Sequence, residues 1–375
     1  MKNNHFNSYL FIIVILLNVA LLPQTSVNIL PGSLTVNSAG TVSVQLLVSN
    51  IANLHSASVN IGFDSTVLRY SSISNGSFLQ SNNMGYSVVL FKTFYPNSIS
   101  PNQVKVGQDI LGNASVTGSG LLFTINFTTN HAGRTAISIA DFTMLDLNSN
   151  IISASSISGS VTVSINLSPK AFFEGSYNGT TMNTTLNSSS YLPLHQPYTG
   201  APWNYSGNES VGGGYFSKHS NIVDWVLLEL RSGTSADSIV AKRAAFILNN
   251  GNIVDLDGSS NVRFSGPAAW SYYIVIKHRN HIAVMSAAPQ ALDLAVVSYD
   301  FTTASTQAYG NNLLKIGSKW CIYAGDVNQD GIVDSGDLRI VDNENANYVS
   351  GYTATDLNGD GIVDSGDLGI TDNNK

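Results

Sequence analysis

The last 50 residues carry acidic and amide side chains at a spacing that suits calcium. Residues 326–338 read DVNQDGIVDSGDL and residues 356–368 read DLNGDGIVDSGDL, so eleven of thirteen positions agree between two copies. Calcium takes about six to eight oxygen ligands, and a 12-residue loop supplies them mainly from alternate positions. We therefore expect two Ca²⁺ sites, one per loop. The expected ligands are Asp326, Asn328, Asp330, the carbonyl of Ile332, Asp334 and Asp337 in the first loop, and Asp356, Asn358, Asp360, the carbonyl of Ile362, Asp364 and Asp367 in the second.

The residues between these ligands also suit a metal-binding loop. Gly331 and Gly361 occupy position 6, where the chain must turn sharply and a side chain would collide. Val333 and Val363 at position 8 are apolar, as expected if the loops pack against each other or against a core. The alternative is a repeated Asp-Gly turn that holds no metal, which leaves most of the shared positions unexplained.

Charge is concentrated in the same segment. From residue 326 onward the net charge is −9, whereas the other 325 residues together carry +2. A nearly neutral body argues against binding nucleic acid through a basic surface. Repulsion among the carboxylates opposes folding of so small a segment, so we expect it to be disordered or loosely folded until calcium binds. Circular dichroism during a calcium titration would test this expectation.

The repeat resembles a dockerin, because each loop ends in Asp at position 12 and no helix precedes the loop. This resemblance implies that calcium orders two loop–helix units and that one face of the pair binds a cohesin. It also implies that positions 10 and 11 contribute to partner choice, and these are Ser335, Gly336, Ser365 and Gly366. Only eight residues follow the second loop from position 368, so we expect its helix to be short or absent.

The beginning of the chain predicts export. Residues 1–25 combine Lys2, a polar stretch and an apolar run, which is typical of a secretory signal peptide. The run at residues 10–22 has 13 residues, short of the roughly 20 that a membrane-spanning helix needs. We therefore expect an extracellular or cell-surface protein with no membrane span after processing. Cys321 is the only cysteine, which excludes an intramolecular disulfide.

Residues 26–166 predict an antiparallel β-sandwich. Apolar and polar residues alternate in short runs separated by Asn, Ser and Gly, which is the pattern of half-buried strands. The clearest runs are residues 41–48 (TVSVQLLV), 57–63 (ASVNIGF), 121–127 (LLFTINF), 135–139 and 159–165. The order and spacing of FDSTVL at residue 63, GLLFTINF at residue 120 and GSVTV at residue 159 resemble a cohesin domain. Cohesins are similar in fold to some carbohydrate-binding modules, so the resemblance leaves binding to protein or to sugar open.

The centre of the chain divides into two predicted parts. Residues 167–202 are rich in Asn, Ser, Thr, Gly and Pro and predict a linker or a long surface loop. Residues 203–320 predict a second β-rich domain, with a hairpin that turns near KHRNH at residues 277–281. Phrases such as VDWVLLELR resemble a module of multidomain exported bacterial proteins, to which the resemblance attaches no activity. Residues 321–375 complete the chain as the dockerin-like module.

Three other groups of residues invite a chemical interpretation. His278 and His281 could bind a metal, but in a hairpin turn we expect them to point in different directions with no carboxylate nearby. Asp255 and Asp257 could form the acid–base pair of a glycosidase, although a strand that ends in an Asp-Gly turn explains them equally well. The four Trp residues and 16 Tyr residues could stack on sugars, but such residues more often pack in a core.

Together these features predict a mainly β chain composed of a β-sandwich, a second β-rich domain and a small α-helical calcium-loop module. The leading functional hypothesis is a non-catalytic secreted scaffold or adaptor that assembles proteins through calcium-dependent cohesin–dockerin contacts, in an extracellular polysaccharide-degrading or cell-surface complex. Its partners would be proteins that bear a cohesin or a dockerin, including a second copy of this chain. The alternatives are a surface protein whose sandwich binds polysaccharide, and a glycoside hydrolase subunit that carries a dockerin.

Overall fold

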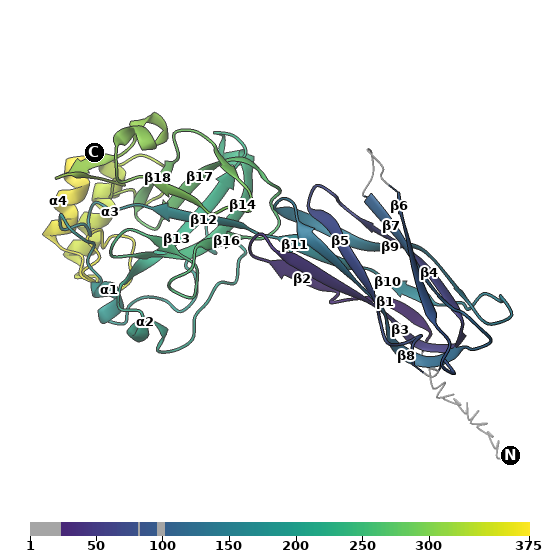
Figure 1. The fold of residues 1–375 in the computed structure, drawn as a ribbon. Coiled ribbons are helices and arrows are strands. Elements are labelled where there is room, and N and C mark those ends of the chain that lie inside the picture. The colour runs from purple at the N-terminus through teal and green to yellow at the C-terminus, as the bar shows by residue number, and fades with distance from the viewer. Residues whose placement is uncertain (1–23, 82, 96–101) are drawn as a thin grey trace, which may run out of the picture.

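The computed structural model describes residues 24–81, 83–95 and 102–375. The predicted signal peptide therefore lies almost entirely outside the described residues. Two bodies are joined end to end, and helices α3 and α4 lie at the edge farthest from the first body (Figure 1). Within the described ranges, no helix has the length and apolar character needed to cross a membrane.

The first body is a two-sheet sandwich, as predicted. Most strand pairs are antiparallel, and the parallel pairs are β1 with β10 and β2 with β11. One sheet has the order β10 (Ser155–Ile157), β1 (Ser26–Leu30), β3 (Thr41–Leu54), β8 (Val116–Thr129) and β5 (Leu68–Asn75). The other has the order β2 (Ser33–Val36), β11 (Gly159–Val163), β9 (Gly133–Leu145), β4 (Ser56–Phe63), β7 (Asn102–Ile110) and β6 (Val88–Tyr95).

Alternation of apolar and polar residues explains why these segments form a sandwich. In β3, the residues at alternate positions from Val42 to Val48 are buried and those between them are mostly exposed. Strands with this period of two bury one face against the opposite sheet and leave the other in water. The buried residues of both sheets form one continuous core that is separate from the core of the second body.

The second body is built on a six-stranded sheet with a smaller sheet beside it. Its central strand, β13 (Ile222–Arg231), is buried along its whole length, which explains its mostly apolar sequence, and the charged Asp224, Glu229 and Arg231 within it are buried too. The large sheet contains β15 (Ile253–Val254), β14 (Ile239–Leu248), β13, β17 (Trp270–His278), β18 (His281–Met285) and β19 (Gln290–Leu292). The smaller sheets are β16 (Val262–Phe264), β12 (Ile165–Lys170) and β20 (Val297–Asp300), and the pair β21 (Leu314–Ile316) and β22 (Lys319–Cys321). Short helical turns complete it at α1 (Thr185–Ser188), α2 (Tyr215–Lys218), η1 (Ala236–Ser238), η2 (Ser305–Gln307) and η3 (Tyr309–Asn311).

The prediction that residues 167–202 form a linker or a surface loop is wrong. Strand β12 follows the last sandwich strand directly and pairs with both β16 and β20. Phe173 and Met182 belong to one core of the second body, and Leu186 and Tyr198 belong to another. The polar composition misleads because Asn and Ser here hydrogen-bond backbone groups inside the body, which satisfies them without regular secondary structure.

The C-terminal residues form two loop–helix units packed against the second body. Helix α3 (Ser335–Ala346) follows the first loop and helix α4 (Ser365–Asn374) follows the second. No helix leads directly into Asp326, because the described residues just before it belong to strand β22 and the coil that follows it. The second helix has ten residues and the first has twelve. The second helix is therefore present, and the expectation that it is absent is wrong.

Candidate functional site

The two predicted calcium loops share most of their internal hydrogen bonds, although in the second loop the first Asp also accepts from the N–H groups of Gly359 and Asp360. In the second loop, the Asp356 carboxylate accepts from Gly361 N at 3.0 Å, and the Asn358 amide oxygen accepts from Asp360 N at 2.8 Å. The first loop repeats these contacts between residues 326 and 331 and between 328 and 330. Both glycines at position 6 have positive φ, 92° and 87°, which a residue with a side chain rarely adopts. The sequence pattern therefore produces two matching turns with their oxygens on the inside.

Each loop runs into its helix through an acidic cap. The Asp334 side chain accepts from Gly336 N at 2.6 Å, while the Asp337 carboxylate accepts from Asp334 N at 3.1 Å. The same Asp337 carboxylate also accepts from Val327 N at 2.9 Å, so position 12 ties the start of the loop to the start of the helix. Asp364 and Asp367 do the same in the second unit. These are capping boxes, which stabilise helix starts.

The loops hold more negative charge than their surroundings compensate. Burial, and then the neighbouring Asp337, raise the pKa of Asp326 to about 6. Burial raises the pKa of Asp356 to about 7; Arg279 opposes this rise and Asp367 adds to it. The buried Oδ1 of Asp326 has no hydrogen-bond partner. Uncompensated carboxylates and an orphaned oxygen are what a divalent cation would satisfy, so the donors present fit calcium.

Within the described ranges, no three His, Cys, Asp or Glu side chains are already drawn together as a metal-ligand set. The position-12 carboxylates instead accept hydrogen bonds from the loop backbone. The ligand assignment predicted from the sequence therefore remains a prediction. The side chains of Ile332 and Ile362 are 64% and 57% exposed, and Val333 and Val363 are buried as predicted.

The four predicted partner-binding residues lie in the first turns of the two helices. Ser335, Ser365 and Gly366 are exposed and Gly336 is half-buried. A Cβ on Gly336 would lie 2.9 Å from the Asp334 carboxylate, so the cap itself favours glycine at this position. Position 11 therefore has a local structural role that the sequence does not reveal.

A groove of about 470 Å³ runs between the two helices. Its residues include the equivalent pairs Leu338 and Leu368, and Asp342 and Asp372, which reflect the internal repeat. The third equivalent pair differs in sequence, because Arg339 of the first helix corresponds to Gly369 of the second. The two helices that line the groove lie at the edge of the molecule farthest from the sandwich (Figure 1).

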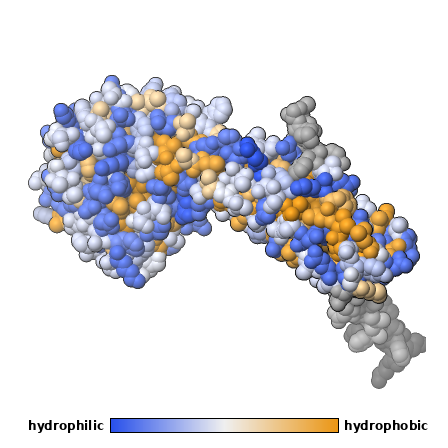
Figure 2. Space-filling view, viewed as in Figure 1, coloured by the Kyte–Doolittle hydropathy of each residue, from blue (hydrophilic) through white to orange (hydrophobic). Residues whose placement is uncertain are grey.

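The sandwich also exposes apolar side chains on its edge strand β6. Val89 and Phe91 are 41% and 40% exposed. The Phe91 ring lies over Gly107 of β7, where an added Cβ would come within 2.0 Å of the ring. Apolar residues also gather on the visible face of the sandwich in Figure 2. The apolar run VVLFKTFY at residues 88–95 was the available signal for this strand, and it did not enter the sequence prediction.

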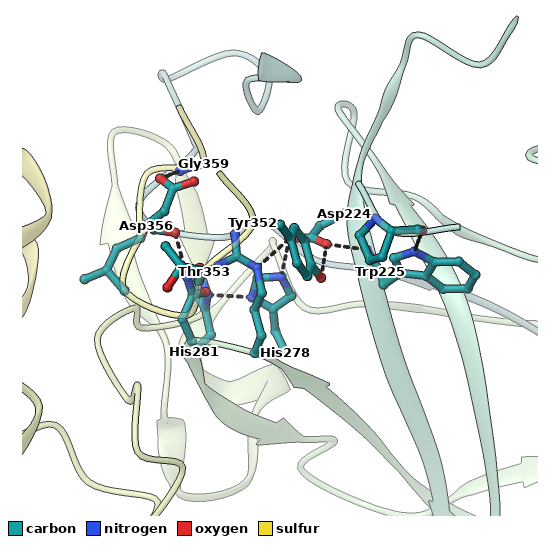
Figure 3. Close-up of polar contacts among 12 residues, drawn as sticks. Asp224, Trp225, His278, His281, Tyr352, Thr353, Asp356 and Gly359 are labelled. Carbon is teal, nitrogen blue, oxygen red and sulfur yellow. Dashed lines mark hydrogen bonds and ion pairs between the residues drawn. The ribbon is translucent and has the colours of Figure 1, made fainter. Parts of the chain in front are cut away.

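His278 and His281 were predicted to point apart with no carboxylate nearby, and this prediction is wrong. They pair directly across the β17–β18 hairpin, which places both side chains on one face of the sheet, with their Nδ1 atoms 2.9 Å apart. The Nε2 of His278 lies 3.0 Å from the carboxylate of Asp224, a residue of β13 that is distant in sequence (Figure 3). Arg279 donates to the same carboxylate at 3.0 Å, and Tyr352 of the tail donates to it at 2.8 Å.

This buried cluster joins the second body to the tail. The Arg279 guanidinium lies 4.6 Å from the centre of the Tyr352 ring and donates to the carbonyl of Thr353. Burial would raise the pKa of Asp224, but Arg279 and then His278 outweigh it and lower the pKa to about 2. Asp224 is therefore ionised and forms a buried ion pair with Arg279 inside the second body, and Tyr352 and Thr353 of the tail pack onto this pair.

The other candidate groups have structural roles. Asp255 is buried in ion pairs with Arg243 and Arg263, at 2.6 Å and 3.1 Å. Asp257 accepts from the backbone N–H groups of the turn that follows it. Burial raises the pKa of Asp255, but Arg243 and other partners outweigh it, so this pKa is lowered and the residue suits an ion pair better than proton transfer. Of the four Trp residues, Trp225 is buried and Trp270 is 68% exposed.

Comparison with known proteins agrees with the predicted modules. The family described as the cohesin domain matches residues 27–163, and the family described as the dockerin type I domain matches residues 324–374. Cellulose-binding protein A of Clostridium cellulovorans is 29% identical over 150 residues, which cover 38% of this chain but only 8% of that protein.

Solved structures that resemble part of this chain include cohesins. A non-cellulosomal cohesin from Archaeoglobus fulgidus is 18% identical, with a TM-score of 0.31, and covers 38% of this chain and 91% of its own. A type II cohesin domain from the cellulosome of Acetivibrio cellulolyticus is 16% identical, with the same TM-score, and covers 37% and 95%. The two family matches alone give this chain an N-terminal cohesin domain and a C-terminal type I dockerin domain.

Proposed function

We propose that this protein is a secreted, non-catalytic adaptor that receives a dockerin on its sandwich and docks onto a cohesin through its tail. The observation that carries the proposal is the presence of both complementary domains at opposite ends of one chain (Figure 1). Because the two domains lie far apart, one molecule can contact two partners simultaneously. A second copy of this chain is one possible partner, and such head-to-tail contacts would give open chains.

Each end offers a surface for its partner. On the sandwich, the exposed side chains of β6 supply apolar contact area on an edge strand. On the tail, the groove between α3 and α4 combines Leu338 and Leu368 with charged residues around them. An apolar centre with a polar rim is typical of protein interfaces. Calcium would shape this second surface, because both helices begin at the ends of the loops.

Calorimetry with the whole chain would test the tail. The whole chain would be titrated with its own sandwich, residues 24–164, and with a type I cohesin of Clostridium thermocellum, first in calcium and then in a chelator. The sandwich has a core of its own and is suited to separate preparation. We expect calcium-dependent binding to at least one of the two cohesins. Calcium uptake without binding to either cohesin would count against the adaptor role.

The corresponding test of the sandwich uses Phe91→Ser. We expect this variant to weaken binding of a type I dockerin while leaving calcium uptake by the tail unchanged. Exposed Tyr348, which lies in the tail, provides the matched control as Tyr348→Ser. Equal dockerin binding by both variants would exclude β6 as the interface.

A second candidate function is polysaccharide binding, which one observation favours. A cleft of about 700 Å³ lies between the sandwich and the second body, and the exposed Trp270 lines it. Polar side chains from both bodies line the same cleft, among them Asp64, Arg134 and Asp293. An aromatic face beside carboxylates suits a sugar ring, which has apolar C–H faces and a hydroxyl rim.

Affinity electrophoresis in gels containing hydroxyethylcellulose or soluble xylan would test this second function. We expect the whole chain to be retarded and Trp270→Ala to migrate freely, with Tyr348→Ala as the control for loss of an exposed aromatic residue. Equal mobility of all three proteins, with and without polysaccharide, would rule out the sugar site.

A further inference from the structure

The two calcium loops are nearly identical in sequence but differ in their surroundings. In the first loop Asn328, Asp330 and Gly331 are exposed. In the second loop the equivalent Asn358 and Asp360 are half-buried and Gly361 is buried. The first loop faces solvent, whereas the second body covers one side of the second loop.

The only two differences between the 13-residue repeats occur where the second loop contacts the second body. Val327 is replaced by Leu357, which is 2% exposed and lines a small buried cavity with Phe173 and His281. Gln329 is replaced by Gly359, where an added Cβ would lie 3.7 Å from Asn183.

Backbone conformation does not explain the second replacement. Gln329 and Gly359 have positive φ angles of 61° and 71°, so both loops adopt a left-handed conformation at this position. This conformation favours glycine in either copy, yet the first loop has glutamine there. The two positions differ instead in their surroundings, because Asn183 of the second body lies beside Gly359. The sequence difference between the repeats therefore follows their packing.

Side chains of the second body also bind the backbone of the second loop. Asn280 donates to the carbonyl of Asp356 at 2.7 Å, and Asn183 donates to the carbonyl of Asn358. Gly175 packs so closely that an added Cβ would lie 2.1 Å from the carbonyl of Leu357. The first loop is tied only at its entry, where Gly325 N donates to the carbonyl of Asn280 at 2.9 Å, and by a long contact of 3.5 Å from Gln329.

We propose that the second body holds the second calcium loop in its folded shape, so that the two calcium ions of this dockerin are inequivalent. The second loop is preorganised and releases its ion slowly, whereas the first loop orders and disorders with its ion. The physical basis is that ordering a loop costs conformational entropy, which packing against Leu357 and the two Asn side chains has already offset. This inference rests on the calcium binding proposed above.

Release of calcium from the whole chain into a fluorescent chelator, followed by stopped flow, tests the proposal. We expect two phases that differ at least tenfold in rate. Asp326→Ala is expected to remove the fast phase and Asp356→Ala the slow phase. Failure of the wild type to take up any calcium would refute the proposed function, whereas two ions released at one rate would refute only the inequivalence.

Exchanging the two differing residues separates packing from loop sequence. Leu357→Val with Gly359→Gln gives the second loop the sequence of the first, and we expect the slow phase to accelerate about tenfold. The matched control, Val327→Leu with Gln329→Gly, gives the first loop the sequence of the second while leaving it exposed. If the control slows the fast phase to the rate of the slow one, loop sequence explains the difference and the proposal fails.

Discussion

Removing the charge of Arg279 is the most direct test of how the second body and the dockerin are joined. Arg279→Met keeps most of the side-chain volume but leaves the Asp224 carboxylate buried without its cationic partner. It also removes the guanidinium from the Tyr352 ring and from the carbonyl of Thr353. The perturbation therefore acts on both sides of the contact between the two parts of the chain.

The magnitude follows from the ionisation of Asp224. Its pKa falls from 3.8 to about 2 although burial opposes the fall, and a shift of this size corresponds to about 2 kcal/mol. Removing Arg279 loses this gain and leaves the cost of burial uncompensated, which raises the expected destabilisation to about 3–5 kcal/mol. Adding Asp224→Asn removes the buried charge, so we expect the double variant to be less destabilised than Arg279→Met alone.

The pH dependence of the unfolding free energy tests the same reasoning independently. In the wild type the folded pKa of Asp224 is lowered, so its contribution is complete above about pH 4 and is lost as the pH falls through about 2. In Arg279→Met burial raises this pKa, so the unfolded chain loses its proton first and stability falls as the pH rises above about 4. We expect the variant to differ more from the wild type at pH 7 than at pH 5.

Urea denaturation followed by tryptophan fluorescence measures these differences, because all four Trp residues lie between residues 203 and 320. Both proteins would be measured in calcium, with protein concentration held constant. A destabilisation below about 1 kcal/mol, or one that shrinks from pH 5 to pH 7, would refute the view that the buried Asp224–Arg279 pair supports the contact between the second body and the tail.

Three further predictions concern other parts of the chain. Burial lowers the pKa of both His278 and His281 below 6.5, so the unfolded chain takes up protons first and we expect urea-measured stability to fall between pH 6.5 and 5, by at most about 1.6 kcal/mol per histidine; His281→Asn should flatten this dependence. Gly107→Val displaces the Phe91 ring from β7, and we expect little change in melting temperature but at least tenfold weaker dockerin binding by calorimetry. Burial raises the pKa of the Cys321 thiol to about 12, so mass spectrometry should find it unmodified by iodoacetamide in the native protein and fully modified in urea.

The parts of the fold that the sequence predicts well depend on local patterns. Strand β3 alternates between buried and exposed residues over most of its length, and this period alone indicates a sandwich strand. The calcium loops are equally local, since ligands, glycine and helix cap all lie within one 12-residue segment. In both cases each side chain has its role fixed by near neighbours in the chain.

The features that the sequence did not predict depend on contacts between distant residues. Asp224 meets His278 only because β13 and β17 lie side by side in the large sheet. Asn183 meets the second calcium loop across 175 residues, although its composition predicts a linker. The identity of a polar residue predicts neither of these contacts, because Asn is equally suited to an exposed loop and to a buried hydrogen bond.

Contacts between distant residues also determine which parts of the chain fold together. The sandwich meets the second body through Ala132 and Leu294 and through polar contacts such as His131 with Asp293 at 2.6 Å, whose side chains are substantially exposed. The dockerin instead contacts the buried Asp224–Arg279 pair through Tyr352 and Thr353, and it buries the side chain of Leu357 against the second body. A fragment that begins at residue 321 exposes Leu357 and loses Asn280 and Arg279 together. If such a fragment fails to bind a cohesin, the failure reports lost folding of the second loop, whereas failure of a fragment that begins at residue 165 reports recognition itself.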